Sequence, residues 1–262
     1  MNYKNVALSV IVGMALVGVH SVAPLQALAA ELEDIRERGY LIVGVQDDIR
    51  PLSYQNEIGQ LEGLEIDVAR QLAEELLGAD GQIVFQPVSN EERISALLSG
   101  DVDVVIARIT ATASRSRLVD FSPPYYMDGT AVVTKHARVQ TVSDLSNGAI
   151  AVLNGSTTID DLRFLIPQIN LIGVNSYQEA LNLLESDQAV AFAADASVLT
   201  GWVQEYPAYR LLPTLLSAEP LSVAMPKGLQ YGDLRQRINE AITQWRDEGW
   251  LQERIEYWGL PE

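Results

Sequence analysis

The chain has 262 residues, of which 18 are basic and 35 acidic, so its formal net charge is −17. This negative charge makes nucleic acid an unfavourable partner, because affinity for phosphates comes largely from cationic side chains. No cysteine is present, which excludes a disulfide framework and a lipid anchor attached through an N-terminal cysteine.

Residues 1–30 differ in composition from the rest of the chain. Lys4 lies near the start, an apolar stretch runs from Val6 to Val19, and the small residues ALAA occupy 27–30. This order is typical of a secretory signal peptide cleaved after Ala29 or Ala30. The apolar stretch, at roughly 14 residues, is shorter than the roughly 20 that a spanning helix needs. We expect an exported protein without a membrane anchor.

The following part of the chain alternates strand-like and helix-like segments. Residues 40–45 (YLIVGV) are a β-rich apolar run, and apolar residues from Leu64 to Leu76 recur at helical spacing. The alternation continues with a strand over 83–88, a helix over 91–100 and a buried strand over 101–107. Such alternation indicates a parallel sheet covered by helices on both faces.

A second alternating series follows residues 130–135. It comprises a helix near 143–147, a strand over 149–153, a helix from Ile159, a strand over 170–174, a helix over 176–186 and a strand over 189–194. Both series contain a helix, an acidic turn and a buried strand, once as ALLSGDVDVVIA and once as LLESDQAVAFAA. Two lobes of similar design are therefore predicted. A β-rich segment over 221–225 and helices over 231–248 and 250–259 complete the chain.

Polar residues follow three of the predicted strands, where parallel sheets place their ligands. Thr110 and Arg115 follow the strand over 101–107, Ser156 and Thr157 follow the strand over 149–153, and Asp195 follows the strand over 189–194. Arg115 offers a planar fork for a carboxylate, and free N–H groups at Ser156 and Thr157 add partial positive charge. Asp195 supplies the counter-charge for an ammonium group, and the Thr110 hydroxyl can serve either group. Together they suit the two charges of a free amino acid.

Each of these residues also has an ordinary structural interpretation. Arginine is mostly a solvated surface residue. The NGSTTID segment is compatible with a simple helix cap, and Asp195 with the cap of the helix that follows it.

Several motifs together resemble one protein family. GLEIDVARQL, VDVVIARITATASRSRLVDFSPPYY, GSTT, PKG and a C-terminal WG occur in this order. They are similar to the polar amino-acid-binding proteins of bacterial ATP-driven importers, the family 3 extracellular solute-binding proteins, over the entire chain after the predicted signal peptide.

The resemblance implies a two-lobed periplasmic-binding-protein fold of type II, α/β in class, in which each lobe is a mostly parallel sheet flanked by helices. Lobe 1 would comprise residues 31–127 and 221–262, and lobe 2 residues 128–220, with crossings near 127–132 and 216–223. Ligand contacts from both lobes would favour the closed form. The implied protein is a periplasmic monomer without cofactor or metal, which passes a free L-amino acid to an inner-membrane ABC permease.

The resemblance also assigns residue roles. Thr110 and Arg115 match the family's carboxylate-binding threonine and arginine, Thr157 with Ser156 matches the second-lobe loop, and Asp195 matches the acid that pairs with the α-amine. Arg108 departs from the family, because many relatives have a glycine or an apolar residue at this position.

The side chain of the ligand is less well determined. Arg93 resembles an arginine that faces the second carboxylate in glutamate and aspartate binders, and Tyr177 resembles a tyrosine at that end of the cleft. Asp47 is predicted at the mouth of the cleft. A surface pair of Arg93 with Glu91 or Glu92 and a core position for Tyr177 are the alternatives. We expect an acidic amino acid, with glutamine next, and a basic one is opposed by Arg93 and Arg108.

An enzyme is the main competing class, because the fold also resembles periplasmic cyclohexadienyl or arogenate dehydratases. Their chemistry needs a proton donor, for which Asp195 is the obvious candidate, but amine binding explains this residue better. With no cysteine and only His20 and His136, the sequence offers no nucleophilic triad or metal site. The sequence thus predicts a binding protein with no catalytic residue. An amino-acid sensor on the same fold is a further alternative.

Overall fold

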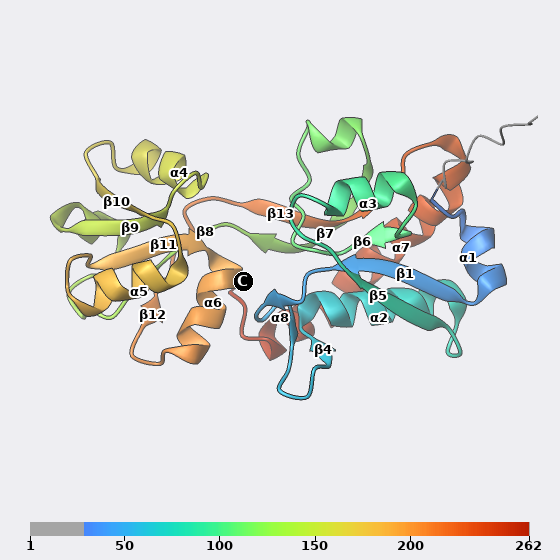
Figure 1. The fold of residues 1–262 in the computed structure, drawn as a ribbon, viewed down its shortest axis with the longest axis horizontal. Helices are drawn as coiled ribbons and strands as arrows, with labels where there is room; N and C mark the ends of the chain where they lie inside the picture. Colours follow the sequence, from blue (N-terminus) through green and yellow to red (C-terminus); the bar gives the residue numbers. More distant parts are fainter. Residues whose placement is uncertain (1–28, 262) are drawn as a thin grey trace, which may run out of the picture.

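The computed structural model describes residues 29–261 and shows two lobes, each built on its own five-stranded sheet (Figure 1). Almost all of the predicted signal peptide lies outside the described residues. Among those described, no helix is both long and apolar enough to cross a membrane.

The sheet of lobe 1 has the strand order β5-β1-β6-β13-β7. Its strands β5, β1 and β6 pair in parallel, and β13 pairs antiparallel with both β6 and β7. Only β13 therefore runs against the other four. The bounds are β1 (Tyr40–Val45), β5 (Gln82–Pro87), β6 (Val104–Val105), β7 (Asp120–Asp128) and β13 (Glu219–Met225).

Helices cover both faces of this sheet, because successive strand residues point to opposite sides. Val104 packs into a cluster with α2 and α7, whereas the next residue, Val105, packs with Leu97 of α3. The predicted apolar stripe of α2 is wholly buried at Leu64 and Leu72. The helices of lobe 1 are α1 (Leu32–Arg38), α2 (Leu64–Leu77), α3 (Arg93–Ser99), α7 (Gly232–Asp247) and α8 (Trp250–Tyr257).

Lobe 2 repeats this design with the strand order β10-β9-β11-β8-β12. Strands β10, β9 and β11 are parallel, and β8 runs against both of its neighbours. Each sheet is thus mostly parallel with one reversed strand. The elements are β8 (Thr130–Thr134), β9 (Ala149–Leu153), α4 (Thr158–Leu165), β10 (Asn170–Val174), α5 (Tyr177–Glu185), β11 (Ala191–Asp195), α6 (Ala196–Glu205) and β12 (Arg210–Leu211).

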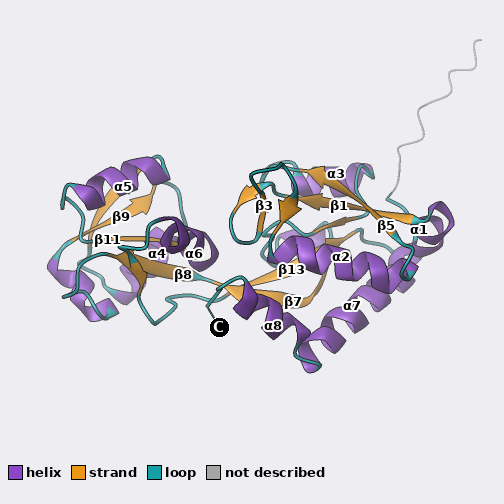
Figure 2. Ribbon diagram, turned by 90° about the horizontal axis from the view of Figure 1, so that it is seen from below, coloured by secondary structure: helices purple, strands orange, loops and turns teal. Residues whose placement is uncertain are grey.

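The chain passes between the lobes twice, and the two passages lie side by side (Figure 2). The first passage runs from β7 through Gly129 into β8, and the second leads from Ser217 into β13. A side chain at Gly129 would place its Cβ 2.0 Å from the Ser217 carbonyl oxygen. Glycine is therefore required for the two backbones to approach this closely.

Several short elements differ from the predictions. The strand expected over 101–107 is only two residues long in β6. It begins after Asp103, whose carboxylate accepts hydrogen bonds from the Ile42 N–H (2.7 Å) and from Arg38. The helix expected near 143–147 is a 3-10 helix, η2 (Val142–Asn147). The remaining short elements are β2 (Asp48–Ile49), β3 (Ser53–Gln55), β4 (Leu61–Glu62), η1 (Arg115–Arg117) and η3 (Leu229–Tyr231).

Candidate ligand-binding site between the lobes

A cavity of about 340 Å³ lies between the lobes. Seven of the nine predicted site residues line it, and Asp47 and Tyr177 do not. Its lining comprises Asn90, Arg93, Arg108, Thr110, Arg115, Asp128, Ser156, Thr157, Asp195, Glu219 and Leu221.

Arg115 and Thr110 enter the cavity from a loop of lobe 1 that is fastened to β13. The Ala111 N–H donates to the Pro220 carbonyl at 3.0 Å, and the Arg115 Nη1 donates to the Thr110 carbonyl at 2.9 Å. The Thr110 hydroxyl donates to the Glu219 Oε2 at 3.3 Å. The backbone thus fixes the direction of the Arg115 guanidinium before any ligand arrives.

Arg93 opens α3 and is only 6% exposed. Its Nη1 donates to the carbonyls of Ala107 (2.7 Å) and Arg108 (2.8 Å). The alternative surface pair with Glu92 is not formed, because the Glu92 carboxylate accepts from Ser89 instead. Burial, and then the neighbouring Arg115 and Arg108, lowers the pKa of Arg93 to about 10, so the group is still cationic at neutral pH.

The backbone of Arg108 is held by Glu65, a wholly buried residue of α2. One carboxylate oxygen, Oε1, accepts both the Arg108 N–H and the Tyr125 hydroxyl at 2.6 Å each. Arg108 has a φ of 46°, in the left-handed region that few non-glycine residues adopt. Burial raises the pKa of Glu65. A glycine would adopt this conformation without strain, whereas here an arginine adopts it.

The Arg108 guanidinium reaches across the cavity and forms an ion pair with Asp195 of lobe 2. Burial alone would lower the pKa of Arg108, but the Asp195 carboxylate together with Tyr177, Asp128 and Glu65 raises it above its usual value. Asp195 stands at the N-cap position of α6, but its side chain makes no capping hydrogen bond. The carboxylate is therefore directed to the cavity.

The loop after β9 differs in part from its prediction. The Ser156 N–H is not free for a ligand, because it donates to the Leu153 carbonyl at 3.2 Å and closes a turn. The Ser156 hydroxyl accepts the Thr158 N–H at 3.2 Å. Thr157 is the N-cap residue of α4, and its side chain makes no capping hydrogen bond.

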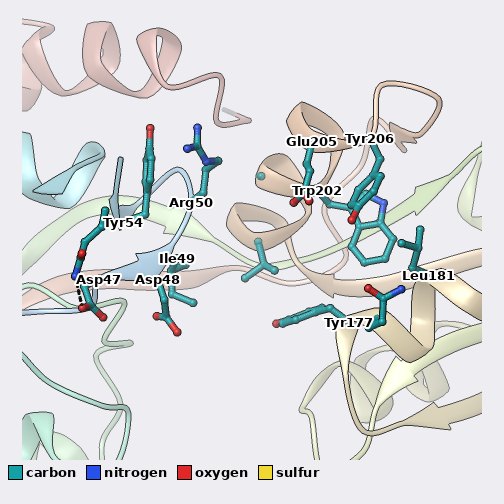
Figure 3. Close-up of a pocket in the computed structure, with 14 residues that line it drawn as sticks. Asp47, Asp48, Ile49, Arg50, Tyr54, Tyr177, Leu181, Trp202, Glu205 and Tyr206 are labelled. Atoms are coloured by element: carbon teal, nitrogen blue, oxygen red, sulfur yellow. Dashed lines mark hydrogen bonds between the residues drawn. The ribbon is translucent and has the colours of Figure 1, made fainter. Parts of the chain in front are cut away.

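A second cavity, of about 430 Å³, is also lined by residues of both lobes (Figure 3). Asp47 and Tyr177 line this second cavity, where the lobe 1 residues around Tyr54 face Trp202 and Tyr206 of lobe 2. Asp47 accepts a hydrogen bond from the Gln55 amide at 2.8 Å. Tyr177 packs edge-on against the core residue Phe192, with ring centroids 6.0 Å apart.

Two further carboxylates of the first cavity, Asp128 and Glu219, were not predicted from the sequence. Both stand on the strands that pass between the lobes. Burial is the main cause that raises the pKa of each. The one sequence signal that could have pointed to these two carboxylates was their position at the two predicted crossings between the lobes. In the described part of the chain, no group of three or more His, Cys, Asp or Glu side chains could hold a metal ion.

A two-lobed fold with a cavity between mixed sheets limits the families to which the chain could belong. The comparison with family models decides the assignment. The model of the bacterial extracellular solute-binding proteins, family 3, matches residues 41–261. The chain belongs to this family. The resemblance inferred from the GLEID, DFSPPYY and GSTT motifs is thereby confirmed.

Curated relatives and solved structures agree with the family. A glutamine-binding protein of Geobacillus stearothermophilus is 35% identical over 199 residues, which are 75% of this chain and 76% of that protein. The ABC transporter glutamine-binding protein GlnH of Bacillus subtilis (strain 168) is 30% identical, over 87% of this chain and 84% of its own. The solved structure of an ancestral cationic amino acid solute-binding protein is similar with a TM-score of 0.74 and 29% identity, covering 87% of this chain and 98% of that one.

Proposed function

We propose that this protein is the periplasmic ligand-binding component of an ATP-driven amino-acid importer and that it binds one free acidic L-amino acid, with glutamine as the next candidate. The observation that carries the proposal is the convergence of three guanidinium groups on one cavity between the lobes, from Arg93, Arg108 and Arg115. The relatives named as glutamine-binding proteins support an amino-acid ligand.

The arrangement of charges favours a ligand with two oxygen-rich ends. Arg115 and Thr110 form the subsite for the α-carboxylate, and Arg93 serves the group at the far end of the side chain. The Nε atoms of Arg93 and Arg108 are buried without a hydrogen-bond partner within the described residues, and such groups gain from a carboxylate acceptor. A side-chain amide offers only one carbonyl oxygen, so glutamine uses this subsite less fully than glutamate does.

Lobe closure converts this binding into a signal. The carboxylate contacts come from lobe 1, whereas Asp195, Ser156 and Thr157 come from lobe 2, so a ligand that touches both sets stabilises the closed form. The closed form is what an importer distinguishes from the empty protein. No covalent step is required.

Calorimetric titration tests the proposal. The protein without residues 1–30 is unfolded to remove bound ligand, refolded, and titrated with glutamate, aspartate, glutamine, arginine and leucine. We expect one-to-one binding, tightest for the acidic pair. Binding of none of the five would contradict the proposal.

The variant Arg93→Ala locates the side-chain subsite. Loss of a charge-assisted hydrogen bond from the buried Arg93 should weaken the binding of glutamate by about 100-fold and of glutamine by about 10-fold. The ratio of the two affinities is the readout, because it does not depend on the fraction of folded protein. An unchanged ratio would remove Arg93 from the specificity argument and leave the family assignment intact.

A further inference from the structure

Asp195 has a cationic partner on the opposite lobe. Arg108 of lobe 1 donates from Nη1 to the Asp195 Oδ2, and the two side chains are 17% and 34% exposed. The other ion pairs in the described part of the chain join residues of the same lobe. A side-chain cation therefore stands where the resemblance to the family would put the ammonium group of an amino acid.

The ion pair is supported by the backbone of lobe 1. Glu65 binds the N–H of Arg108, and Arg93 binds its carbonyl oxygen, so the main chain is held on both sides of the residue. This places the base of the side chain at the cavity wall in the left-handed conformation. Arg108 is thus positioned to reach Asp195.

The other carboxylates of the cavity are also occupied. The Asp128 Oδ1 accepts the N–H groups of Gly129 (2.9 Å) and Ser197 (3.0 Å), and its Oδ2 accepts the Ser197 hydroxyl (2.5 Å). Glu219 accepts the Thr110 hydroxyl. The lining of the cavity therefore contains three carboxylates and three guanidinium groups.

The cavity consequently offers more to the carboxylate of a ligand than to its ammonium group. A carboxylate meets buried donors without partners at the Nε atoms of Arg93 and Arg108. An ammonium group meets only carboxylates that are already hydrogen-bonded, and Asp195 shares its charge with Arg108. The Asp195 Oδ1 takes no part in the ion pair, so an ammonium group fits there with a smaller gain than an unpaired carboxylate would give.

We propose that Arg108 is a built-in counter-ion of Asp195, so that the cavity accepts short dicarboxylates and similar acids without an α-ammonium group as well as amino acids. The inference rests on the proposed function for the location of the ligand. It adds a class of ligands and makes Arg108 the residue that sets the dependence on the ammonium group.

Two pairs of probes measure this dependence. L-glutamate is compared with glutarate, and L-glutamine with glutaramate, because the members of each pair differ only in the α-ammonium group. In the unaltered protein we expect the affinities within a pair to agree within about 10-fold, since the ammonium group adds little to a neutralised Asp195.

Arg108→Gly is the decisive variant, because glycine adopts a φ of 46° without strain. It leaves Asp195 without its partner, so the amino acid should bind at least about 100-fold more tightly than its amine-free counterpart. Arg108→Lys keeps a cation near Asp195 and should restore the small ratio. Arg235→Ala is the control, because it removes an ion pair with Asp120 that does not line the cavity, and it should leave the ratio of the unaltered protein unchanged.

The outcomes separate this inference from the proposed function. The role of Arg108 is overturned if the unaltered protein binds the amino acid more than about 100-fold more tightly than its amine-free counterpart. It is also overturned if Arg108→Gly shows the same ratio of affinities as the unaltered protein. Binding of an amine-free acid but of no amino acid supports the inference and contradicts the amino-acid ligand. Failure of all four probes to bind overturns the inference.

Discussion

The two lobes share a strand order but contribute to the cavity in different ways. Lobe 1 supplies Arg93, Arg108 and Arg115, whose positions are fixed by hydrogen bonds to backbone carbonyls and to the buried Glu65. Lobe 2 supplies side chains at the ends of strands, of which Thr157 is exposed and Asp195 is half-buried. The cationic half of the site is therefore held by lobe 1 itself, whereas Asp195 of the other half is held by its ion pair with Arg108.

The difference follows from how each half is supported. In lobe 1, α2 and β7 bring Glu65 and Tyr125 behind the cavity wall, so a second layer of buried polar groups orients the first. In lobe 2, the N-cap residues of α4 and α6, Thr157 and Asp195, line the cavity directly. Preorganisation reduces the cost of ordering side chains on binding, so lobe 1 should contribute most of the affinity.

The largest effect is expected for Arg115→Ala compared with Thr157→Ala. Loss of the preorganised guanidinium should weaken the binding of every amino acid by about 1000-fold, because it removes the charge-assisted partner of the carboxylate. Loss of the Thr157 hydroxyl should weaken binding by about 10-fold or less. Calorimetric titration of both variants measures the contrast, and equal losses would contradict the division of roles between the lobes.

The next effect concerns the support of lobe 1. Glu65→Ala leaves the Arg108 N–H and the Tyr125 hydroxyl without their acceptor in the interior. The free energy of unfolding should fall by about 3 kcal/mol, since each buried unsatisfied group costs about 1–3 kcal/mol. The variant Glu65→Gln keeps an acceptor oxygen, so its free energy of unfolding should fall by much less. Denaturant unfolding gives both values, and equal losses would show that the acceptor is not what matters.

The same pair of proteins tests a pH dependence. Burial raises the pKa of Glu65 above its usual 4.5, so the folded protein holds this proton more tightly than the unfolded chain. The contribution of this group to stability is then fully present below pH 4.5 and is lost as the pH rises through the folded-state pKa. The unfolding free energy of the unaltered protein, relative to that of Glu65→Gln, should therefore decrease as the pH rises. A difference that is constant with pH would contradict the raised pKa.

The sequence predicted those features that depend on local patterns. The stripe from Leu64 to Leu76 is buried in α2, and the residues after three strands meet at one cavity, because parallel strands end at the same edge of their sheet. Motifs extending across the chain identified the family. Arg93 and Arg108 also lie at the cavity, although no local pattern showed what else they bind.

The remaining features depend on residues distant in the chain. Glu65 binds Arg108 and Tyr125, which are 43 and 60 positions away, and Arg108 meets Asp195 at a separation of 87. No periodicity reports such contacts. The left-handed backbone of Arg108 is equally hidden, because arginine gives no local signal for a positive φ. Sequence reasoning therefore named seven of the residues that line this cavity but not the ion pair that links its two halves.

The smallest effect is expected where lobe 2 is joined to the crossing strand. Ser197→Ala removes the hydroxyl that donates to the Asp128 Oδ2 and leaves the Ser197 N–H bond to Oδ1 in place. We expect a loss of about 1.5 kcal/mol in the free energy of unfolding, because the lost bond had a buried carboxylate as its acceptor.

Thr200→Ala is the matched control for Ser197→Ala. The Thr200 hydroxyl donates to the Ala196 carbonyl within the same helix, α6, and does not touch the crossing strand. Its removal should cost less than the removal of the Ser197 hydroxyl, because the carbonyl is a neutral acceptor. The Ser197 hydroxyl lowers the pKa of Asp128 against the effect of burial, so Ser197→Ala should also shift the titration of Asp128 upward, which NMR detects. If both variants lost equal stability and Asp128 titrated unchanged, the bond between Asp128 and Ser197 would have no special part in attaching lobe 2.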